Sequence, residues 1–290
     1  MWRALAFLVA MSLGAAPRID KQVHRAVKHF HGTVCLFAKN LDTGSSYGLR
    51  ADERVRAAST IKVPIMVAAF AAVAEGRARW DELLTLRDAD KISGAGVLHE
   101  LSGGLRLPLV DLLHLMIVVS DNTATNLLLA RLSPDAVNVE MDKLGLGATR
   151  CLRQIRGEGA ARGYSRAGLI KENQKFGLGV STPREMVLLL EKIERGEVVS
   201  PAASKEMIAI LKRQQLRDGL ARRLGELPVA SKSGALDHLR SDAGIIYSPG
   251  GRIALAITVD DLPQMEYSPD NPGTLLIWRL GQVLENGLKQ

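Results

Sequence analysis

The sequence predicts an α/β protein of the α+β type, in which an antiparallel sheet flanked by helices is interrupted by an all-helical lobe. Strand-like patterns occur near both ends of the 290-residue chain, whereas helical patterns fill its centre. The simplest arrangement is one α/β lobe built from residues 17–56 and 213–290, with a helical lobe, residues 57–212, inserted between them.

The first sixteen residues have the order of a secretory signal peptide. Residues 1–3 include Arg3, residues 4–13 are apolar, and residues 14–16 are the small residues of a cleavage site. The apolar part is too short to span a bilayer comfortably. We therefore expect residues 1–16 to direct export to the periplasm or the extracellular space, leaving no stable membrane anchor; a buried first helix is the alternative.

The composition is that of an ordinary globular protein with a basic excess, which is either a solvated basic surface or a feature that attracts anionic partners. The formal net charge is +7 at pH 7, which favours anionic ligands. The sequence contains no Lys/Arg block with interleaved aromatic residues, so nucleic-acid binding is not expected. The histidines form no cluster with ligand spacing, and we expect neither a metal nor another cofactor. We expect a monomer.

Export would permit a disulfide between the two cysteines, Cys35 and Cys151. Cys35 lies in an apolar, strand-like run and Cys151 in a polar, Arg-rich stretch, and the sequence leaves their pairing open. A buried, unpaired Cys35 is the simpler expectation. Neither cysteine has a basic partner beside it, so neither is expected to be a nucleophile.

The segment before residue 57 is predicted to form a helix and a β-hairpin. Residues 19–30 have the helical pattern, and residues 33–39 form a strand that a turn joins to a second strand. Residues 44–48, Gly-Ser-Ser-Tyr-Gly, match the nucleophile elbow of α/β-hydrolases. That elbow requires a helix immediately after the serine, whereas residues 49–56 are polar. We therefore interpret Ser46 as part of a hairpin tip.

Helical signals dominate the centre of the chain. The apolar run from Ile65 predicts a helix that is buried on most of its surface. Further helices are predicted over residues 109–119, 123–132, 134–144 and 201–211. Thr182 and Glu185 form a capping box, with Pro183 at the first position of a helix that ends near residue 194. Residues 150–179 predict a long loop, and such loops often carry function.

The period changes towards the C-terminus. Three strands are predicted over residues 229–235, 243–247 and 252–259, and the last two are joined by a turn at residues 248–251. Residues 271–288 close the chain as an amphipathic helix.

Ser59 and Lys62 form the first candidate catalytic pair. Ser59 lies at the N-terminal edge of the buried helix, where serine is a favoured cap. Lys62 lies on the same helical face, so its amine can reach the Ser59 hydroxyl. A serine hydroxyl is a poor nucleophile until a base takes its proton, and a lysine can act as that base where burial or a second cation lowers its pKa. A chance match is the alternative, so the pair needs support from elsewhere.

Two later motifs give this support: Ser-Asp-Asn at residues 120–122 and Lys-Ser-Gly at residues 232–234. Taken alone, the first could be helix-end capping and the second a strand with a solvated lysine. In the order Ser-x-x-Lys, Ser-Asp-Asn, Lys-Ser-Gly, however, the three resemble the set of class A β-lactamases and penicillin-binding proteins. The resemblance covers residues 32–288 and implies a class A β-lactamase-like serine hydrolase with the β-lactamase/transpeptidase-like fold.

The resemblance implies a catalytic role for four residues. Ser59 would attack a carbonyl carbon to form an acyl-enzyme. Lys62 would accept the Ser59 proton, helped by Lys232, whose like charge disfavours a second ammonium. Ser120 would relay a proton to the leaving nitrogen.

It also implies a substrate-binding role for five residues. Asn122 has a donor and an acceptor for an acylamide side chain, and Ser233, with the preceding lysine, would hold a substrate carboxylate. Gly234 would let the strand approach closely. The N–H of Ala235, with that of the nucleophile, would form the oxyanion hole. Arg240 is expected either to assist the binding of the carboxylate or to be simply an exposed arginine.

The sequence departs from the resembled family at the residue that activates water for deacylation. Class A enzymes carry a glutamate on the loop after the Ser-Asp-Asn motif. Here the corresponding position falls near Ile155, and the nearest carboxylates are Glu158 and Glu172. Acylation is therefore better supported than turnover.

The resemblance implies a small-molecule β-lactam or peptidoglycan-type substrate, and three functions fit this pattern. The first is an exported β-lactamase in which Glu158 or Glu172 acts on water. The second is a D-alanyl-D-alanine peptidase or an esterase of cell-wall metabolism. The third is a binding protein or sensor that is acylated by β-lactams and deacylates slowly, a possibility that the lack of an evident membrane anchor disfavours.

Overall fold

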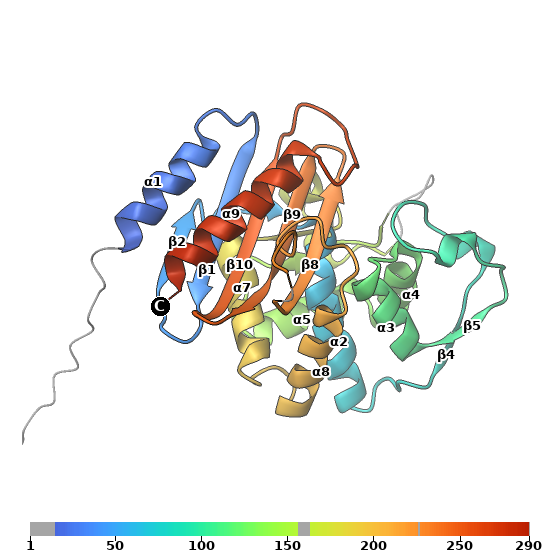
Figure 1. Cartoon of the computed structure of the whole chain (residues 1–290). Helices are drawn as coiled ribbons and strands as arrows, with labels where there is room; N and C mark the ends of the chain where they lie inside the picture. Colours follow the sequence, from blue (N-terminus) through green and yellow to red (C-terminus); the bar gives the residue numbers. More distant parts are fainter. Residues whose placement is uncertain (1–14, 156–162, 226, 290) are drawn as a thin grey trace, which may run out of the picture.

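The computed structural model describes residues 15–155, 163–225 and 227–289. A five-stranded antiparallel sheet in the order β2-β1-β10-β9-β8 forms the centre of one lobe (Figure 1). Its strands are Thr33–Asn40 (β1), Ser46–Leu49 (β2), Val229–Leu236 (β8), Leu239–Ser248 (β9) and Gly251–Asp260 (β10). The sheet therefore combines strands from the two ends of the chain, as the sequence predicts.

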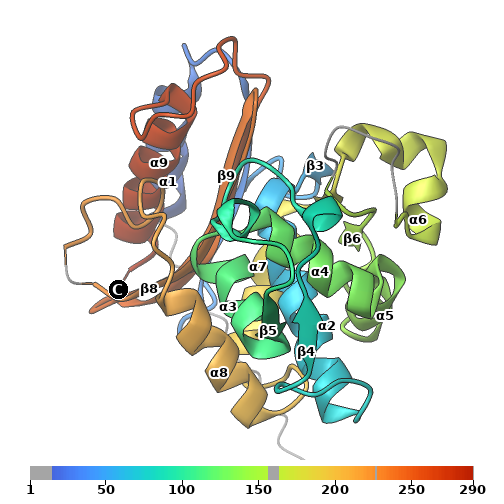
Figure 2. The ribbon, with the colours of Figure 1, turned by 90° about the vertical axis from the view of Figure 1, so that its right-hand side faces the viewer.

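Helices cover both faces of this sheet (Figures 1 and 2). Helices α1 (Ala15–Val27) and α9 (Pro272–Leu288) lie on one face, and α7 (Pro183–Glu194) packs on the other. Strand β10 shows how the sequence specifies this, because successive side chains point to opposite faces of a strand. Leu255 and Ile257 join the apolar cluster of α1 and α9, whereas Ala254 and Ala256 join the cluster of α7 and the helical part.

The helical part is built around α2 (Lys62–Ala74). All residues from Lys62 to Ala72 are buried, which confirms the predicted buried helix. The other helices of this part are α3 (Leu109–Val118), α4 (Asn122–Leu132), α5 (Pro134–Lys143) and α8 (Pro201–Lys212), and α2 contacts all four.

Residues 57–212 are largely helical, but they also contain short strands, which corrects the expectation of an all-helical lobe. Strands β3 (Val55–Arg56), β7 (Gly179–Ser181) and β6 (Arg150–Cys151) form a small sheet, and β4 (Leu83–Thr85) pairs with β5 (Arg106–Pro108). Strands of two or three residues are too short to show an alternating pattern in the sequence. The predicted loop at residues 150–179 also contains α6 (Arg166–Leu169) and the 3₁₀ segment Lys171–Phe176. Three further 3₁₀ segments cover Ala58–Ile61, Asp88–Asp90 and Leu98–Glu100.

Two local predictions have different outcomes. Ser46 is the first residue of β2 and pairs with Lys39 of β1, which confirms the hairpin and excludes the elbow. The capping box is only half formed: Thr182 accepts a bond from the N–H of Glu185 at 3.1 Å. The Glu185 carboxylate instead accepts bonds from the Ala148 N–H and the Thr149 hydroxyl, so it attaches α7 to the segment before β6.

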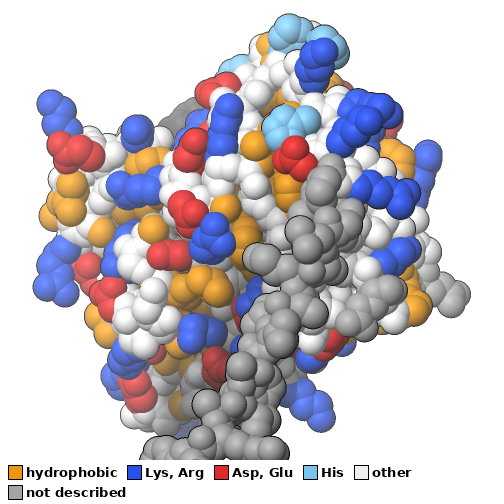
Figure 3. All heavy atoms as spheres, turned by 90° about the vertical axis from the view of Figure 1, so that its left-hand side faces the viewer, with side chains coloured by type: hydrophobic (Ala, Val, Ile, Leu, Met, Phe, Trp, Pro, Cys, Tyr) orange, Lys and Arg blue, Asp and Glu red, His pale blue; other side chains and the backbone are white. Residues whose placement is uncertain are grey.

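Most of the predicted leader, residues 1–14, lies outside the described residues, and α1 begins at Ala15. Within the described part of the chain, no helix is long and apolar enough to cross a bilayer. On the face shown in Figure 3, basic side chains are interspersed with acidic ones, so on that face the positive charge is not gathered into one patch.

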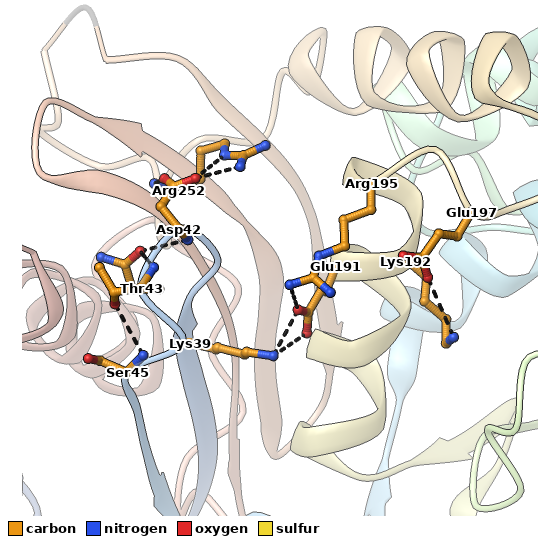
Figure 4. A network of polar contacts seen from close by, with 10 residues as sticks. Lys39, Asp42, Thr43, Ser45, Glu191, Lys192, Arg195, Glu197 and Arg252 are labelled. Atoms are coloured by element: carbon orange, nitrogen blue, oxygen red, sulfur yellow. Dashed lines mark hydrogen bonds and ion pairs between the residues drawn. The ribbon is translucent and has the colours of Figure 1, made fainter. Parts of the chain in front are cut away.

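Ion pairs join α7 to the sheet (Figure 4). The Lys39 amine on β1 donates to both carboxylate oxygens of Glu191 at 2.8 Å, and Arg195 pairs with the same carboxylate at 2.6 Å. Nearby, Arg252 of β10 pairs with Glu194 of α7 at 3.2 Å. The Glu191 side chain is only 5% exposed, so its charge depends on these cations.

Replacing Glu191 by alanine is expected to lower the free energy of unfolding by about 2–4 kcal/mol, because Lys39 would stay largely buried without its partner. Chemical denaturation followed by circular dichroism measures this loss. The matched control is Glu197→Ala, whose carboxylate is 48% exposed and lies 3.8 Å from the Lys192 amine. We expect the control to change stability by less than about 0.5 kcal/mol, and equal losses in the two variants would contradict the prediction.

Candidate active site

The three sequence motifs meet at one cleft of about 1060 Å³. Strand β8 forms one side of this cleft, and the segment that joins α3 to α4 forms another. Seven of the predicted site residues line it: Ser59, Ser120, Asn122, Ser233, Gly234, Ala235 and Arg240. Lys62 and Lys232 are fully buried, and their amines contact these lining residues.

Ser59 lies in the 3₁₀ segment that precedes α2, not at the cap of the helix. The N-cap residue of α2 is Ile61, and neither cap there makes a side-chain bond, so the expectation that Ser59 caps the helix is wrong. The 3₁₀ turn separates β3 from α2, and the partly exposed Ser59 lies on this turn at the cleft.

The backbone beside two of the hydroxyls is strained. Ala58 has φ +48° and Ser120 has φ +58°, in the left-handed region that residues with side chains rarely adopt. Such strain persists only where the surrounding structure enforces it, and it is typical of functional sites. At Ala58 it fixes the turn that presents the neighbouring serine.

Lys62 connects the first motif to the second. Its amine donates to the Ser120 carbonyl at 2.7 Å, to the Ser120 hydroxyl at 3.1 Å and to Asn122 Oδ1 at 3.0 Å. Burial lowers the pKa of Lys62 well below its usual 10.5, the charge of Lys232 lowers it further, and Asp121 opposes the shift. At a given pH, a larger fraction of Lys62 is therefore neutral than of an exposed lysine, and the neutral amine can accept a proton.

Lys232 carries the second buried amine. It donates to the carbonyl of Ser233 at 2.8 Å, and burial lowers its pKa to about 7 despite the opposing charge of Asp242. Burial therefore favours the neutral form of both amines, and at Lys62 the positive charge of Lys232 adds to this effect.

The glycine of the third motif brings β8 against the nucleophile. A Cβ on Gly234 would lie 2.5 Å from Ser241 Oγ, 3.0 Å from the Ser59 nitrogen and 3.1 Å from the Ala58 Cβ. Any side chain would push the strand away from the serine. The resemblance implies that the N–H groups of Ser59 and Ala235 form the oxyanion hole, and this contact brings the strand that carries Ala235 beside Ser59.

Asp121 is a residue that the sequence analysis left without a role. It is fully buried, caps α4 through the Ala124 N–H at 2.8 Å, and accepts bonds from the Val97 and Leu98 N–H groups at 2.6 and 2.9 Å. Asp121 thus joins the loop that contains Val97 and Leu98 to the Ser-Asp-Asn motif. An aspartate directly before a helix is an N-cap signal that could have revealed part of this role.

Arg240 lines the cleft but is 5% exposed, so it is not the exposed arginine of the alternative expectation. Its guanidinium donates to the carbonyl oxygens of Leu236, Leu239 and Glu266 and lies over the Tyr267 ring. These contacts direct three of its N–H groups to the backbone and favour a structural role.

The two candidate deacylation residues have different outcomes. Glu158 lies outside the described residues. Glu172 is exposed in the 3₁₀ segment and does not line the cleft, whereas its neighbour Asn173 is buried and bound to Arg54. Ile155 lines the cleft, and its backbone is held on both sides by the Asn126 side chain at 2.8 and 3.0 Å.

The acidic residues that line the cleft, among those the structure describes, are Asp218, Asp237 and Asp242. All three belong to the part of the chain after α8. In the described ranges, no cluster of three or more His, Cys, Asp or Glu side chains could hold a metal ion.

Both cysteines are buried and unpaired, as expected for Cys35. Cys35 lies on β1 and Cys151 on β6, so the two are on different sheets. Burial raises the pKa of each thiol to about 12, which keeps it from acting as a thiolate nucleophile near neutral pH.

Comparison with known proteins agrees with this geometry. The model of the beta-lactamase enzyme family matches residues 18–288. A beta-lactamase of Rhodobacter capsulatus is 27% identical over 250 residues, which cover 84% of this chain and 81% of that protein. The crystal structure of a beta-lactamase from Sphaerobacter thermophilus is 30% identical, covers 93% of this chain and 97% of that chain, and has a TM-score of 0.80.

A second kind of relative is PBP-A, whose structure is 29% identical, covers 92% of this chain and 94% of that chain, and has a TM-score of 0.76. A mutant of PBP-A has been solved as an acyl-enzyme complex with penicillin G.

Proposed function

Because the chain belongs to the beta-lactamase enzyme family, we propose that it is an exported serine hydrolase that opens β-lactams through an acyl-enzyme on Ser59. The observation that supports this most strongly is the convergence of three distant motifs on one cleft, in which a buried lysine of the first motif bonds the serine of the second.

The contacts suggest a path for the proton during acylation. Ser59 Oγ attacks the amide carbonyl carbon while the neutral Lys62 amine takes the hydroxyl proton. The N–H groups of Ser59 and Ala235 stabilise the negative charge on the carbonyl oxygen. As the C–N bond breaks, Ser120 donates its proton to the leaving nitrogen and regains one from Lys62, which already bonds its hydroxyl at 3.1 Å.

The substrate would be held by the remaining motif residues. Asn122 offers its side-chain amide to an acylamide group of the substrate, and the Ser233 hydroxyl, supported by the positive charge of Lys232, binds the substrate carboxylate. Arg240 has two N–H groups left for this side of the cleft, because the other three donate to backbone carbonyl oxygens.

A slowly deacylating variant of this function is favoured by Ile155. An isoleucine at the cleft cannot activate water, and Glu172 is exposed and does not line the cleft. A D-alanyl-D-alanine peptidase, an esterase or a β-lactam-binding protein would use the same acylation and differ in the acceptor or the deacylation rate.

Stopped-flow mixing with a chromogenic cephalosporin, combined with mass spectrometry of the intact protein, tests the proposal. We expect one acyl group on Ser59, formed in a rapid burst and released slowly. A protein that stays unmodified and leaves the cephalosporin intact would refute it.

Replacing Ile155 by glutamate is expected to accelerate release of the acyl group by about 10²-fold, because a carboxylate at this position can take a proton from water beside the ester. The adduct's half-life in mass spectra measures the effect. The matched control is Ile170→Glu, at an isoleucine that is 52% exposed and does not line the cleft. An unchanged half-life in Ile155→Glu, or the same acceleration in the control, would contradict the prediction.

A further inference from the structure

The wall of the cleft beside Ser233 carries a buried carboxyl group that the proposed acyl chemistry does not use. Asp242 on β9 lies directly opposite Ser233 on β8. Directly opposed residues of an antiparallel pair share a face, with Cβ atoms about 4.5–5.5 Å apart. Asp242 also lines the cleft and is 2% exposed. A substrate group bound by the Ser233 hydroxyl would therefore lie close to this carboxyl.

The Asp242 carboxyl is only half satisfied. Its Oδ2 accepts a bond from the Leu220 N–H at 2.9 Å, whereas its Oδ1 is buried and has no hydrogen-bond partner in the described structure. Gly219 holds the carboxyl in place, because a Cβ there would lie 2.4 Å from Oδ2. A negative charge on a carboxylate with an orphaned, buried oxygen is unfavourable.

The charge at this wall changes near neutral pH. Burial raises the pKa of Asp242 to about 7, opposed by the Leu220 N–H, by Lys232 and by the Ala243 N–H. Lys232 on the neighbouring strand also titrates at about 7. The two groups together therefore pass from a net charge of +1 in acid to −1 in alkali.

The other residues around Asp242 are not expected to produce this change of charge. Asp218, on the segment before β8, is exposed to solvent, where its charge is screened. Arg240 also lines the cleft and stays positively charged between pH 5 and pH 9, so it adds a constant attraction and no pH dependence. Helix α9 contributes the uncharged Thr274 and Ile277 to the cleft. Lys232 and Asp242 are the buried titratable groups beside Ser233, so we attribute to them the change of charge there with pH.

We propose that Asp242 is a specificity-determining residue that admits a substrate carboxylate to Ser233 when its own carboxyl is protonated and repels it when ionised. This inference rests on the proposed function, since it places the acidic group of the substrate at Ser233. Acidic substrates are bound best below neutral pH, whereas a substrate whose acid is esterified is indifferent to Asp242.

Equilibrium binding of penicillin G and of its methyl ester tests this. Isothermal titration calorimetry is performed at pH 5 and pH 9 with Ser59→Ala, in which no acyl transfer occurs, and with the same protein carrying Asp242→Asn. Asparagine keeps the acceptor for Leu220 and removes the charge. At pH 9 we expect the protein with both substitutions to bind the acid at least about tenfold more tightly than the protein with Ser59→Ala alone. At pH 5 the two proteins should bind the acid alike, and the ester should not distinguish them at either pH.

Asp237→Asn is the matched control, since Asp237 also lines the cleft but is exposed and bonds the Tyr267 hydroxyl. It should leave the acid-to-ester affinity ratio unchanged. The inference is overturned if Asp242→Asn leaves that ratio unchanged at pH 9, or if the acid does not bind either protein at pH 5.

Further measurements distinguish failure of the proposed function from failure of the role proposed for Asp242. If Ser59 in the unmodified protein forms no adduct with either compound, the proposed function fails, while the affinity ratio still decides the role of Asp242. If Asp242→Asn does not fold, Asp242→Ser, which also keeps an acceptor, takes its place. A titrating Asp242 also makes the folded protein less stable as the pH rises from about 4 to 7, and thermal unfolding of the neutral variant should lack that decline.

Discussion

Replacing Ser59 by alanine is expected to abolish the covalent adduct with a β-lactam and to lower its rate of opening by at least about 10³-fold. In the proposed mechanism the Ser59 hydroxyl oxygen is the atom that becomes acylated, so its removal leaves no site for the acyl group. Intact-protein mass spectrometry measures the adduct, and hydrolysis of a chromogenic cephalosporin measures the rate.

The sequence itself supplies the control for this experiment. Ser46 is the serine of the Gly-Ser-Ser-Tyr-Gly match, and it is exposed at the start of β2. Ser46→Ala should therefore keep the adduct and the full rate. An adduct that survives in Ser59→Ala and disappears in Ser46→Ala would reverse the assignment of the nucleophile.

Replacing Lys62 by methionine is expected to slow acylation by about 10³-fold, because the Ser59 proton loses its acceptor. Methionine keeps the length and apolar stem of the side chain at a position that is fully buried. Circular dichroism shows whether the variant folds, and stopped-flow absorbance gives the acylation rate.

The pH profile separates a catalytic base from a packing role. Lys62 must be neutral to accept a proton, so acylation by the unmodified protein should rise with pH through the pKa of Lys62, which burial and Lys232 place well below 10.5. In Lys62→Met that rise should disappear. Lys175→Met, at an exposed lysine that also lines the cleft, is the control and should keep both the rate and the profile. A parallel profile in Lys62→Met would contradict the role of the base.

The sequence was sufficient to predict the parts of the site that depend on short motifs. Ser59 and Lys62 lie three residues apart, and the motifs at Ser120 and at Lys232 are contiguous, so each could be recognised without knowing the fold. The sheet and the buried helix were predicted for a similar reason, because alternation and apolar runs extend over enough residues to show a period.

The features that the sequence did not predict depend on how separate segments meet. Asp242 comes opposite Ser233 only through the pairing of β8 with β9, and Arg240 is turned to the backbone by a loop some 26 residues further on. The position of Ser59 in a 3₁₀ turn and the two- and three-residue strands involve too few residues to give a periodic signal. Glu172 could be excluded only when its side chain was located relative to the cleft.

The order of strands in the sheet has a consequence for how the chain acquires its shape. Strand β1 is synthesised early, yet its neighbour β10 comes from the far end of the sequence, and Thr33 bonds Asp261, 228 positions later. Pairings between such distant segments form slowly, because the entropy lost in closing a long loop precedes any stabilising contact. The sheet cannot assemble until almost all of the polypeptide has been made. The nascent chain is thus kept from premature folding by its own topology, and truncation before residue 251 should leave an unfolded product even though all three catalytic motifs are present.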